Sequence, residues 1–290
     1  MTDRPSSSRE PAARPARSFG SVADIYDRGR PSYSRDAVAW ATSAEPLTVL
    51  ELGAGTGKLT EHLVALGHDV HATDPDAAML DVLRARLPEV RTSVTAAEDI
   101  PASERSYDVV VAAQSFHWFD HDRALPEIAR VLKPGGHLAI VFNVRDERIP
   151  WVKKLGRVIA SPPRDRDSQA VLAAAQHFGD PTSETFKTWQ TVDRHSIQDL
   201  VGSRSDVIGL DEEQRASKLA DVLALYDDYG RGMDGMQLPY LTHCSRVQVV
   251  DRPDAPGLDL EGTRSSLHEA TVPIAPPTDD DSGMLLIDFR

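Results

Sequence analysis

The chain has 290 residues with 40% apolar side chains, which is enough to bury the core of one large α/β domain. Its formal net charge of -13 argues against tight binding to nucleic acid or anionic lipid, because clustered Lys and Arg hold phosphates, so a small-molecule substrate is expected. Cys244 is the only cysteine, which excludes an internal disulfide and a cysteine-rich zinc site and fits a reducing compartment.

Residues 1–17 are polar and rich in Pro, Ser and Arg, and we expect them to form a disordered arm. They lack the apolar centre of a secretory signal, and no stretch of the chain approaches the roughly 18 to 20 apolar residues that span a bilayer. A cytoplasmic protein without membrane contact is therefore expected. The segment from Ser18 to Trp40 carries several aromatic side chains, which predicts that it packs on the domain that follows.

From residue 47 onward, apolar runs alternate with helical patterns. Strands are predicted at 47–52, 70–73, near Val94, at 107–113 and at 137–142, and helices at 58–66, 76–87 and 123–133. Asp76 and Pro88 are the expected start and stop signals of the second helix. This alternation predicts a doubly wound α/β fold with a mostly parallel sheet, which binds ligands at the carboxyl ends of its strands.

Beyond Asn143 the pattern is more helical and less regular. It predicts a helix at 151–160, a strand at 186–192, a helix at 215–229 and a last strand at 246–250. We expect one domain over 18–250, with a ligand-binding core at 47–143 and a helical lid and substrate region formed by 18–46 and 144–243. Residues 251–290 are rich in Pro, Asp, Gly and Ser, which predicts a mostly disordered acidic tail.

The sharpest motif is VLELGAGTGKLT at 49–60, in which a buried strand runs into Gly53, Gly55 and Gly57 and a helix begins at once. Backbone N–H groups then face whatever occupies the turn. Dinucleotide sites use G-x-G-x-x-G, and phosphate loops use G-x-x-x-x-G-K followed by Ser or Thr; neither spacing is present. The turn therefore favours a ligand without pyrophosphate, with a plain tight turn as the alternative interpretation.

Asp74 stands at the end of the second predicted strand, where its carboxylate can accept both hydroxyls of a ribose. The alternative is a role as the N-cap of the next helix. After the third strand, the segment 96–101 offers an amide N–H and an acceptor to an adenine edge. Together with the glycine turn, these residues indicate a nucleoside ligand.

The ordered set ELGAGTG, TDPDAAML, AAEDIP, YDVVVAAQSFHWFD and IARVLKPGGHLAIV resembles the class I S-adenosylmethionine-dependent methyltransferases, especially their type 11 small-molecule branch. FGSVADIYDRGRPSY and QSFHWF resemble the subgroup that includes relatives of trans-aconitate methyltransferase. The resemblance covers about residues 18–250. It implies a Rossmann-like sheet, S-adenosyl-L-methionine as cofactor, and methyl transfer to an O, N or carboxyl group of a small molecule.

The resemblance also implies which residues bind the cofactor. The methionine part is expected at Glu51 and the glycine turn, the ribose at Asp74, the adenine after the third strand, and the amino-acid end also at Gln114. The full set is Glu51, Gly53, Ala54, Gly55, Gly57, Asp74, Ala97, Glu98 and Gln114. Because Glu98 and Asp99 are adjacent, either one can point at the base.

A sulfonium is an activated methyl donor, so alignment of the reacting groups is the main requirement, and neither a metal nor a covalent nucleophile is expected. His117 is a candidate base for an acceptor hydroxyl or amine, with simple packing as the alternative. Trp118 and Tyr26 are candidates to stack near the sulfonium, and Arg30 and Tyr33 are candidates to close over the cofactor.

Two other functions stay open at this point. A non-catalytic relative that binds the same cofactor and regulates a partner would carry the same motifs. An NAD-dependent oxidoreductase would share the sheet but would use the other glycine spacing. In each case we expect a monomer or a homodimer.

Overall fold

The computed structural model describes residues 31–159, 168–202, 204, 207, 209–230 and 235–250. All of them belong to the first of the two units into which the chain divides, Met1–Arg252 and Pro253–Arg290. The predicted arm at 1–17 and the predicted tail at 251–290 lie outside the described residues.

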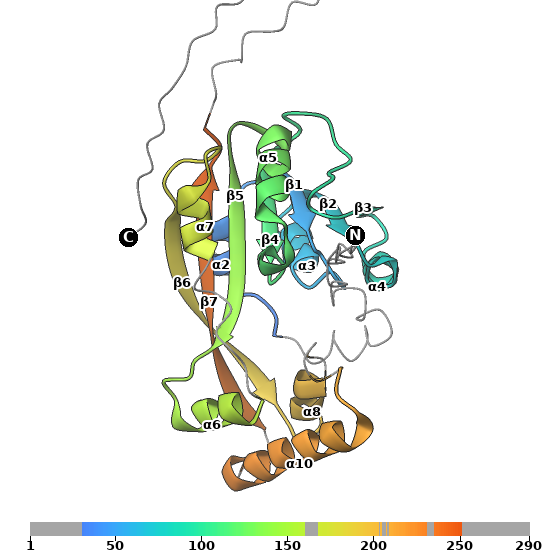
Figure 1. Ribbon diagram of the computed structural model, residues 1–290, viewed down its shortest axis with the longest axis vertical. Coiled ribbons are helices and arrows are strands. Elements are labelled where there is room, and N and C mark those ends of the chain that lie inside the picture. The colour runs from blue at the N-terminus through green and yellow to red at the C-terminus, as the bar shows by residue number, and fades with distance from the viewer. Residues whose placement is uncertain are drawn as a thin grey trace, which may run out of the picture. The chain divides into compact units, whose positions relative to one another are not determined.

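Seven strands form one sheet in the order β3-β2-β1-β4-β5-β7-β6 (Figure 1). The strands are β1 (Thr48–Leu52), β2 (Asp69–Asp74), β3 (Arg91–Val94), β4 (Tyr107–Ala113), β5 (Leu132–Arg145), β6 (Thr182–Val192) and β7 (Met236–Gln248). The five strands from β3 to β5 are parallel, whereas β7 is antiparallel to both β5 and β6. The predicted doubly wound, mostly parallel sheet is therefore confirmed, and the carboxyl ends of β1, β2 and β4 share one edge.

Helices cover both faces of the sheet, and the alternation of side chains along each strand explains the two cores. On one face α2 (Arg35–Ala41), α3 (Thr60–Ala65) and α4 (Ala77–Arg86) pack on a cluster that includes Val49, Val109 and Val141. On the other face α5 (His121–Val131) and α7 (Ser168–Ala174) pack on a cluster that includes Leu50, Val110 and Ile140. Figure 1 shows α5 in front of the sheet.

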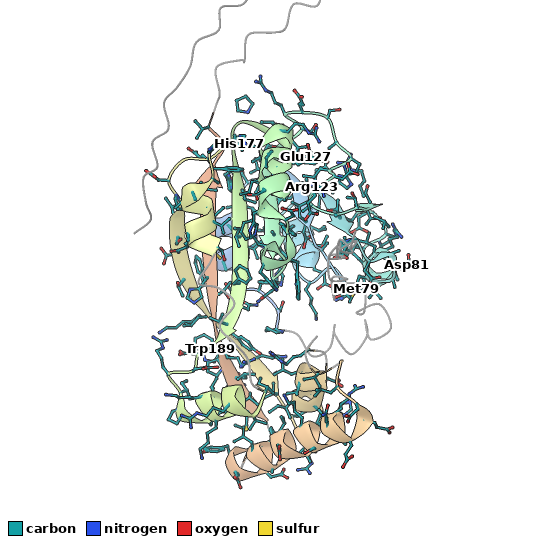
Figure 2. The ribbon with its side chains drawn as sticks, in the orientation of Figure 1. Met79, Asp81, Arg123, Glu127, His177 and Trp189 are labelled. Atoms are coloured by element: carbon teal, nitrogen blue, oxygen red, sulfur yellow. The ribbon has the colours of Figure 1, made fainter. Side chains whose placement is uncertain are left out.

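The helix α4 illustrates how one element is divided between core and surface. Asp76 is its N-cap and accepts a hydrogen bond from the amide of Ala78 at 2.9 Å, as the sequence predicted. Met79 is buried, whereas Asp81 pairs with Arg84 at the surface (Figure 2). The helix ends at Arg86, two residues before Pro88. Local capping and patterning therefore fix this element.

A third core forms where β6 and β7 extend beyond the rest of the sheet. There α6 (Pro150–Val158), α8 (Ser196–Gly202) and α10 (Glu212–Tyr229) pack around Val192, Leu238 and Tyr240. This helical group corresponds to part of the expected lid at 144–243. The same range also contributes β6 and most of β7 to the sheet.

The last strand was predicted only in part. The sequence indicated only 246–250, whereas β7 spans Met236–Gln248 and pairs along its length with β5 and β6. Because β7 lies between two strands, most of its residues are buried on both faces, and it lacks the simple apolar and polar alternation of a surface strand. Among the described residues, no helix has the length and apolar character needed to cross a membrane.

Candidate functional site

The turn after β1 has a backbone that only glycine adopts easily. Gly53, Gly55 and Gly57 have φ angles of 71°, 57° and 89°. A Cβ atom on Gly53 would lie 2.5 Å from the Cβ of Ser115, so this glycine is required for close packing. A Cβ on Gly55 would meet no protein atom within 4 Å. The turn is therefore closed toward β4 at Gly53 and open at Gly55.

Asp74, the last residue of β2, ties this turn to the next loop. One carboxylate oxygen, Oδ2, accepts the amide of Gly55 at 2.9 Å, and the other, Oδ1, accepts the amide of Asp76 at 2.8 Å. Burial raises the pKa of Asp74, and the two amide donors oppose that rise. Because Asp76 is the N-cap of α4, the alternative role suggested for Asp74 belongs to its neighbour.

Glu51 lies below the same turn, on β1, and is only 1% exposed. Its Oε2 accepts a hydrogen bond from the Thr60 hydroxyl at 2.7 Å. Burial raises the pKa of Glu51 to about 8, and the charge of Asp74 adds to the rise, whereas the bond from Thr60 lowers it. Burial therefore favours the neutral form of this carboxyl.

Glu51 and Asp74 thus place two buried carboxyl groups on adjacent strands beneath an open glycine turn. Within the described part of the chain, no Lys, Arg or His side chain is bonded to either group. Burying carboxylates without a cation is costly, and the raised pKa values express that cost. The arrangement is suited to a ligand that carries positive charge and hydroxyl groups.

Gln114 follows β4 at the same edge of the sheet. Its φ of 58° is unusual for a residue with a side chain, and such strain often marks a functional position. Two hydrogen bonds hold Gln114 in this conformation. Its backbone N–H donates to the carbonyl of Val141, and its side-chain Nε2 donates to the carbonyl of Asn143 at 2.9 Å. The next residue, Ser115, donates to the carbonyl of Leu52 at 2.7 Å and joins this turn to β1.

The segment after β3 is held against α5. Ala97 and Glu98 are buried, and Glu98 accepts the amide of Asp120, the N-cap residue of α5, at 2.7 Å. Glu127 of α5, labelled in Figure 2, accepts the amide of Ile100 at 3.3 Å. Asp99 is exposed. Of the two adjacent acids, the structure buries Glu98 and leaves Asp99 at the surface.

The remaining candidates fall into three groups. His117 and Trp118 lie in the short 3₁₀ helix η3 (Phe116–Trp118), where their ring centroids are 4.7 Å apart and the His117 ring is 5.9 Å from that of Phe142. Tyr33 is buried in the core formed with α2 and α3. Tyr26 and Arg30 lie outside the described residues.

Asp74 is joined to the glycine turn by a direct hydrogen bond at Gly55, and Ser115 joins the Gln114 turn to β1. The Glu51 side chain is bonded instead to Thr60, at the start of α3. Sequence reasoning missed Thr60, Ser115 and Asn143. Thr60 carried a weak signal, because it is the first residue of the helix that follows the glycines. No described group of three or more His, Cys, Asp or Glu side chains has the arrangement of a metal site.

Glu51 predicts a pH dependence of stability. Its pKa is about 8 in the folded chain, compared with an ordinary value of 4.5. The folded chain therefore holds this proton more tightly than the unfolded chain, and the resulting stabilisation is complete below pH 4.5 and is lost as the pH rises toward 8. Over this window the free energy of unfolding should fall by about 1.4 kcal/mol per pH unit more steeply than in Glu51→Gln. Urea unfolding of the cofactor-free chains at several pH values measures both slopes, and equal slopes would contradict the assignment.

Comparison with known proteins adds to this geometry. The family profile described as "Methyltransferase domain" matches residues 50–140. An uncharacterized methyltransferase of Mycobacterium tuberculosis is 42% identical over 249 residues, covering 80% of this chain and 96% of the relative. Trans-aconitate 2-methyltransferase of Variovorax paradoxus is 26% identical over 246 residues, covering 78% of this chain and 92% of that protein.

A solved structure gives the same picture of the fold. The putative type II methyltransferase of Anaeromyxobacter dehalogenans superposes with a TM-score of 0.60 at 25% sequence identity, covering 77% of this chain and 99% of that protein. The strand order with an antiparallel β7 is that of the class I methyltransferase fold. The Rossmann-like architecture expected from the sequence motifs is therefore confirmed.

Proposed function

Because the chain belongs to the type 11 branch of the class I methyltransferases, we propose that it transfers a methyl group from S-adenosyl-L-methionine to a small-molecule acceptor. The observation that supports this most directly is the pair of buried carboxyl groups, Glu51 and Asp74, under a glycine turn that is open at Gly55. A sulfonium nucleoside offers both a positive charge and ribose hydroxyls to such a site.

The residues of the site fit this cofactor. Asp74 would accept the ribose hydroxyls, since each carboxylate oxygen has a second lone pair beyond the one used by a backbone amide. Glu51 and the turn backbone would hold the amino-acid end with Gln114, and the buried segment with Ala97 and Glu98 would face the adenine. The assignment rests on charge and placement at the carboxyl edge of β1, β2 and β4.

When bound, the cofactor supplies an activated methyl group on a sulfonium. The contribution of the chain is then to bind, to orient and to exclude water, which can lower a barrier by up to roughly 7 to 11 kcal/mol. His117 and Trp118 follow β4 at the edge where the cofactor would lie, so we place them beside the acceptor. The helices α6, α8 and α10 would supply the rest of the acceptor site.

The acceptor class is open between a hydroxyl, an amine and a carboxylate. The similarity to a trans-aconitate methyltransferase is compatible with a carboxylate, but its 26% identity is well below that of the uncharacterized relative. A carboxylate acceptor needs no base, whereas a hydroxyl or amine benefits from one. The behaviour of His117 therefore distinguishes these classes.

For the hydroxyl and amine classes, His117→Ala should lower kcat by about a hundredfold at saturating acceptor and leave cofactor affinity unchanged, because only proton removal is lost. His121→Ala is the control for loss of an imidazole beside the same short helix: His121 stacks on Phe116 with ring centroids 4.5 Å apart and hydrogen-bonds its carbonyl at 3.0 Å, and we assign it no proton transfer. Steady-state kinetics with the identified acceptor measures both. Near-normal turnover in His117→Ala would rule out the base and favour a carboxylate acceptor.

Binding and turnover test the proposal in two steps. Thermal shift with S-adenosylmethionine, S-adenosylhomocysteine and NAD should show stabilisation by the first two and none by NAD. Transfer of labelled methyl from the cofactor to a metabolite extract should then yield a labelled small molecule. Binding without transfer would favour the non-catalytic regulatory alternative, and binding of NAD alone would favour the oxidoreductase.

A further inference from the structure

Thr60 is a buried residue whose hydroxyl has an unusual partner. It is the first residue of α3, one position after the N-cap residue Leu59, so it does not occupy the position from which a Thr hydroxyl usually caps a helix. The helix α3 has no side-chain cap, and the Thr60 hydroxyl donates to Glu51 Oε2 at 2.7 Å. Neither side chain has appreciable solvent contact.

This bond determines how the Glu51 carboxyl is oriented. Among the described residues, Thr60 is the one side chain that hydrogen-bonds the carboxyl group, and it engages Oε2 alone. Thr73 also approaches Glu51, but its hydroxyl donates to the backbone carbonyl at 3.0 Å and leaves the carboxyl untouched. With Oε2 held by Thr60, the other oxygen, Oε1, accepts no hydrogen bond from a described residue.

We propose that Thr60 is a positioning residue, which holds the Glu51 carboxyl so that Oε1 receives the ammonium group at the amino-acid end of the cofactor. This inference rests on the proposed function. It assigns Thr60 an effect on one end of the ligand only, because the adenosyl end is served by Asp74 and the segment after β3, which Thr60 does not contact.

Two ligands separate this role from a merely structural one. S-adenosylhomocysteine carries the amino-acid end, whereas 5′-methylthioadenosine has the same nucleoside and thioether without it. Thr60→Val keeps the shape of the side chain but removes the donor, so affinity for S-adenosylhomocysteine should fall about tenfold while affinity for 5′-methylthioadenosine stays within about twofold. Thr60→Ser, which keeps the hydroxyl, should restore affinity for S-adenosylhomocysteine.

Thr73→Val is the matched control, because Thr73 is also a buried Thr that bonds Glu51, but only at its backbone. It should not discriminate between the two ligands. Isothermal titration calorimetry on all four chains, with thermal denaturation to check folding, gives the affinities. Equal losses of affinity for both ligands in Thr60→Val, or no loss for either, would overturn the positioning role. The proposed function would still stand in that case, provided that the wild-type chain binds the ligands. Failure of the wild-type chain to bind either ligand would overturn both.

Discussion

Gly55→Val is expected to abolish measurable binding of S-adenosylhomocysteine, with a loss of affinity greater than about a hundredfold. The backbone of Gly55 has a φ of 57°, which a β-branched residue tolerates poorly, and its amide donates to Asp74. The new side chain would also project into the space that is open in the cofactor-free chain, since a Cβ there meets no atom within 4 Å. Backbone strain and occupation of the ligand space therefore act together.

Gly135→Val separates these two effects. Gly135 has a similar φ of 78° and likewise no atom within 4 Å of an added Cβ, but it lies near the start of β5, at the edge of the sheet opposite the site. Both variants should lose about 1–2 kcal/mol of stability from the left-handed backbone. Only Gly55→Val should lose binding in calorimetry. If both variants bind S-adenosylhomocysteine normally, the glycine turn does not hold the cofactor.

Asp74→Ala should weaken S-adenosylhomocysteine binding by about ten- to a hundredfold. Removal of charge-assisted hydrogen bonds to the ribose accounts for about 1.5–3 kcal/mol of binding free energy. The same change removes the acceptor that holds the Gly55 amide, so part of the loss reflects a less ordered turn. Affinity measured by calorimetry tests the assignment, and an unchanged dissociation constant would remove Asp74 from the site.

Asp76→Ala is the control for this prediction. Asp76 stands two residues away and caps α4 through the amide of Ala78, but its side chain has no bond to the glycine turn. Its replacement should lower the free energy of unfolding by about 0.5–2 kcal/mol, the usual contribution of an N-cap, with unaltered affinity. A drop in affinity equal to that of Asp74→Ala would mean that the loop between β2 and α4, and not the Asp74 carboxylate, governs binding.

Much of the sheet could be predicted because its strands carry their pattern locally. Apolar, β-branched runs such as Tyr107–Ala113 are typical of strands that are buried on both faces of a sheet. Asp76 and Pro88 set the ends of α4 through capping and backbone restrictions within a few residues. The short helices α2, α7 and α8 and most of β7 were not predicted, since their stability comes from neighbours distant in the chain.

The candidate site divides in the same way. Glycines with positive φ, and an acidic residue at the end of β2, are dictated by local requirements and appear in the sequence as a motif. The partnership of Glu51 with Thr60 spans nine positions and joins a strand to a helix, so no spacing rule indicates it. Which of Glu98 and Asp99 is buried depends on the N-terminus of α5, more than 20 residues later.

The sequence by itself determined the fold class, the glycine turn and the acidic residue that ends β2, because each follows from interactions between residues close in the chain. Only the tertiary structure decided that Glu51 loses its solvent, that Asp74 binds two backbone amides, and that Tyr33 packs in a core. Burial and pKa depend on the sum of neighbours from several strands and helices, and that sum exists only once the chain has folded.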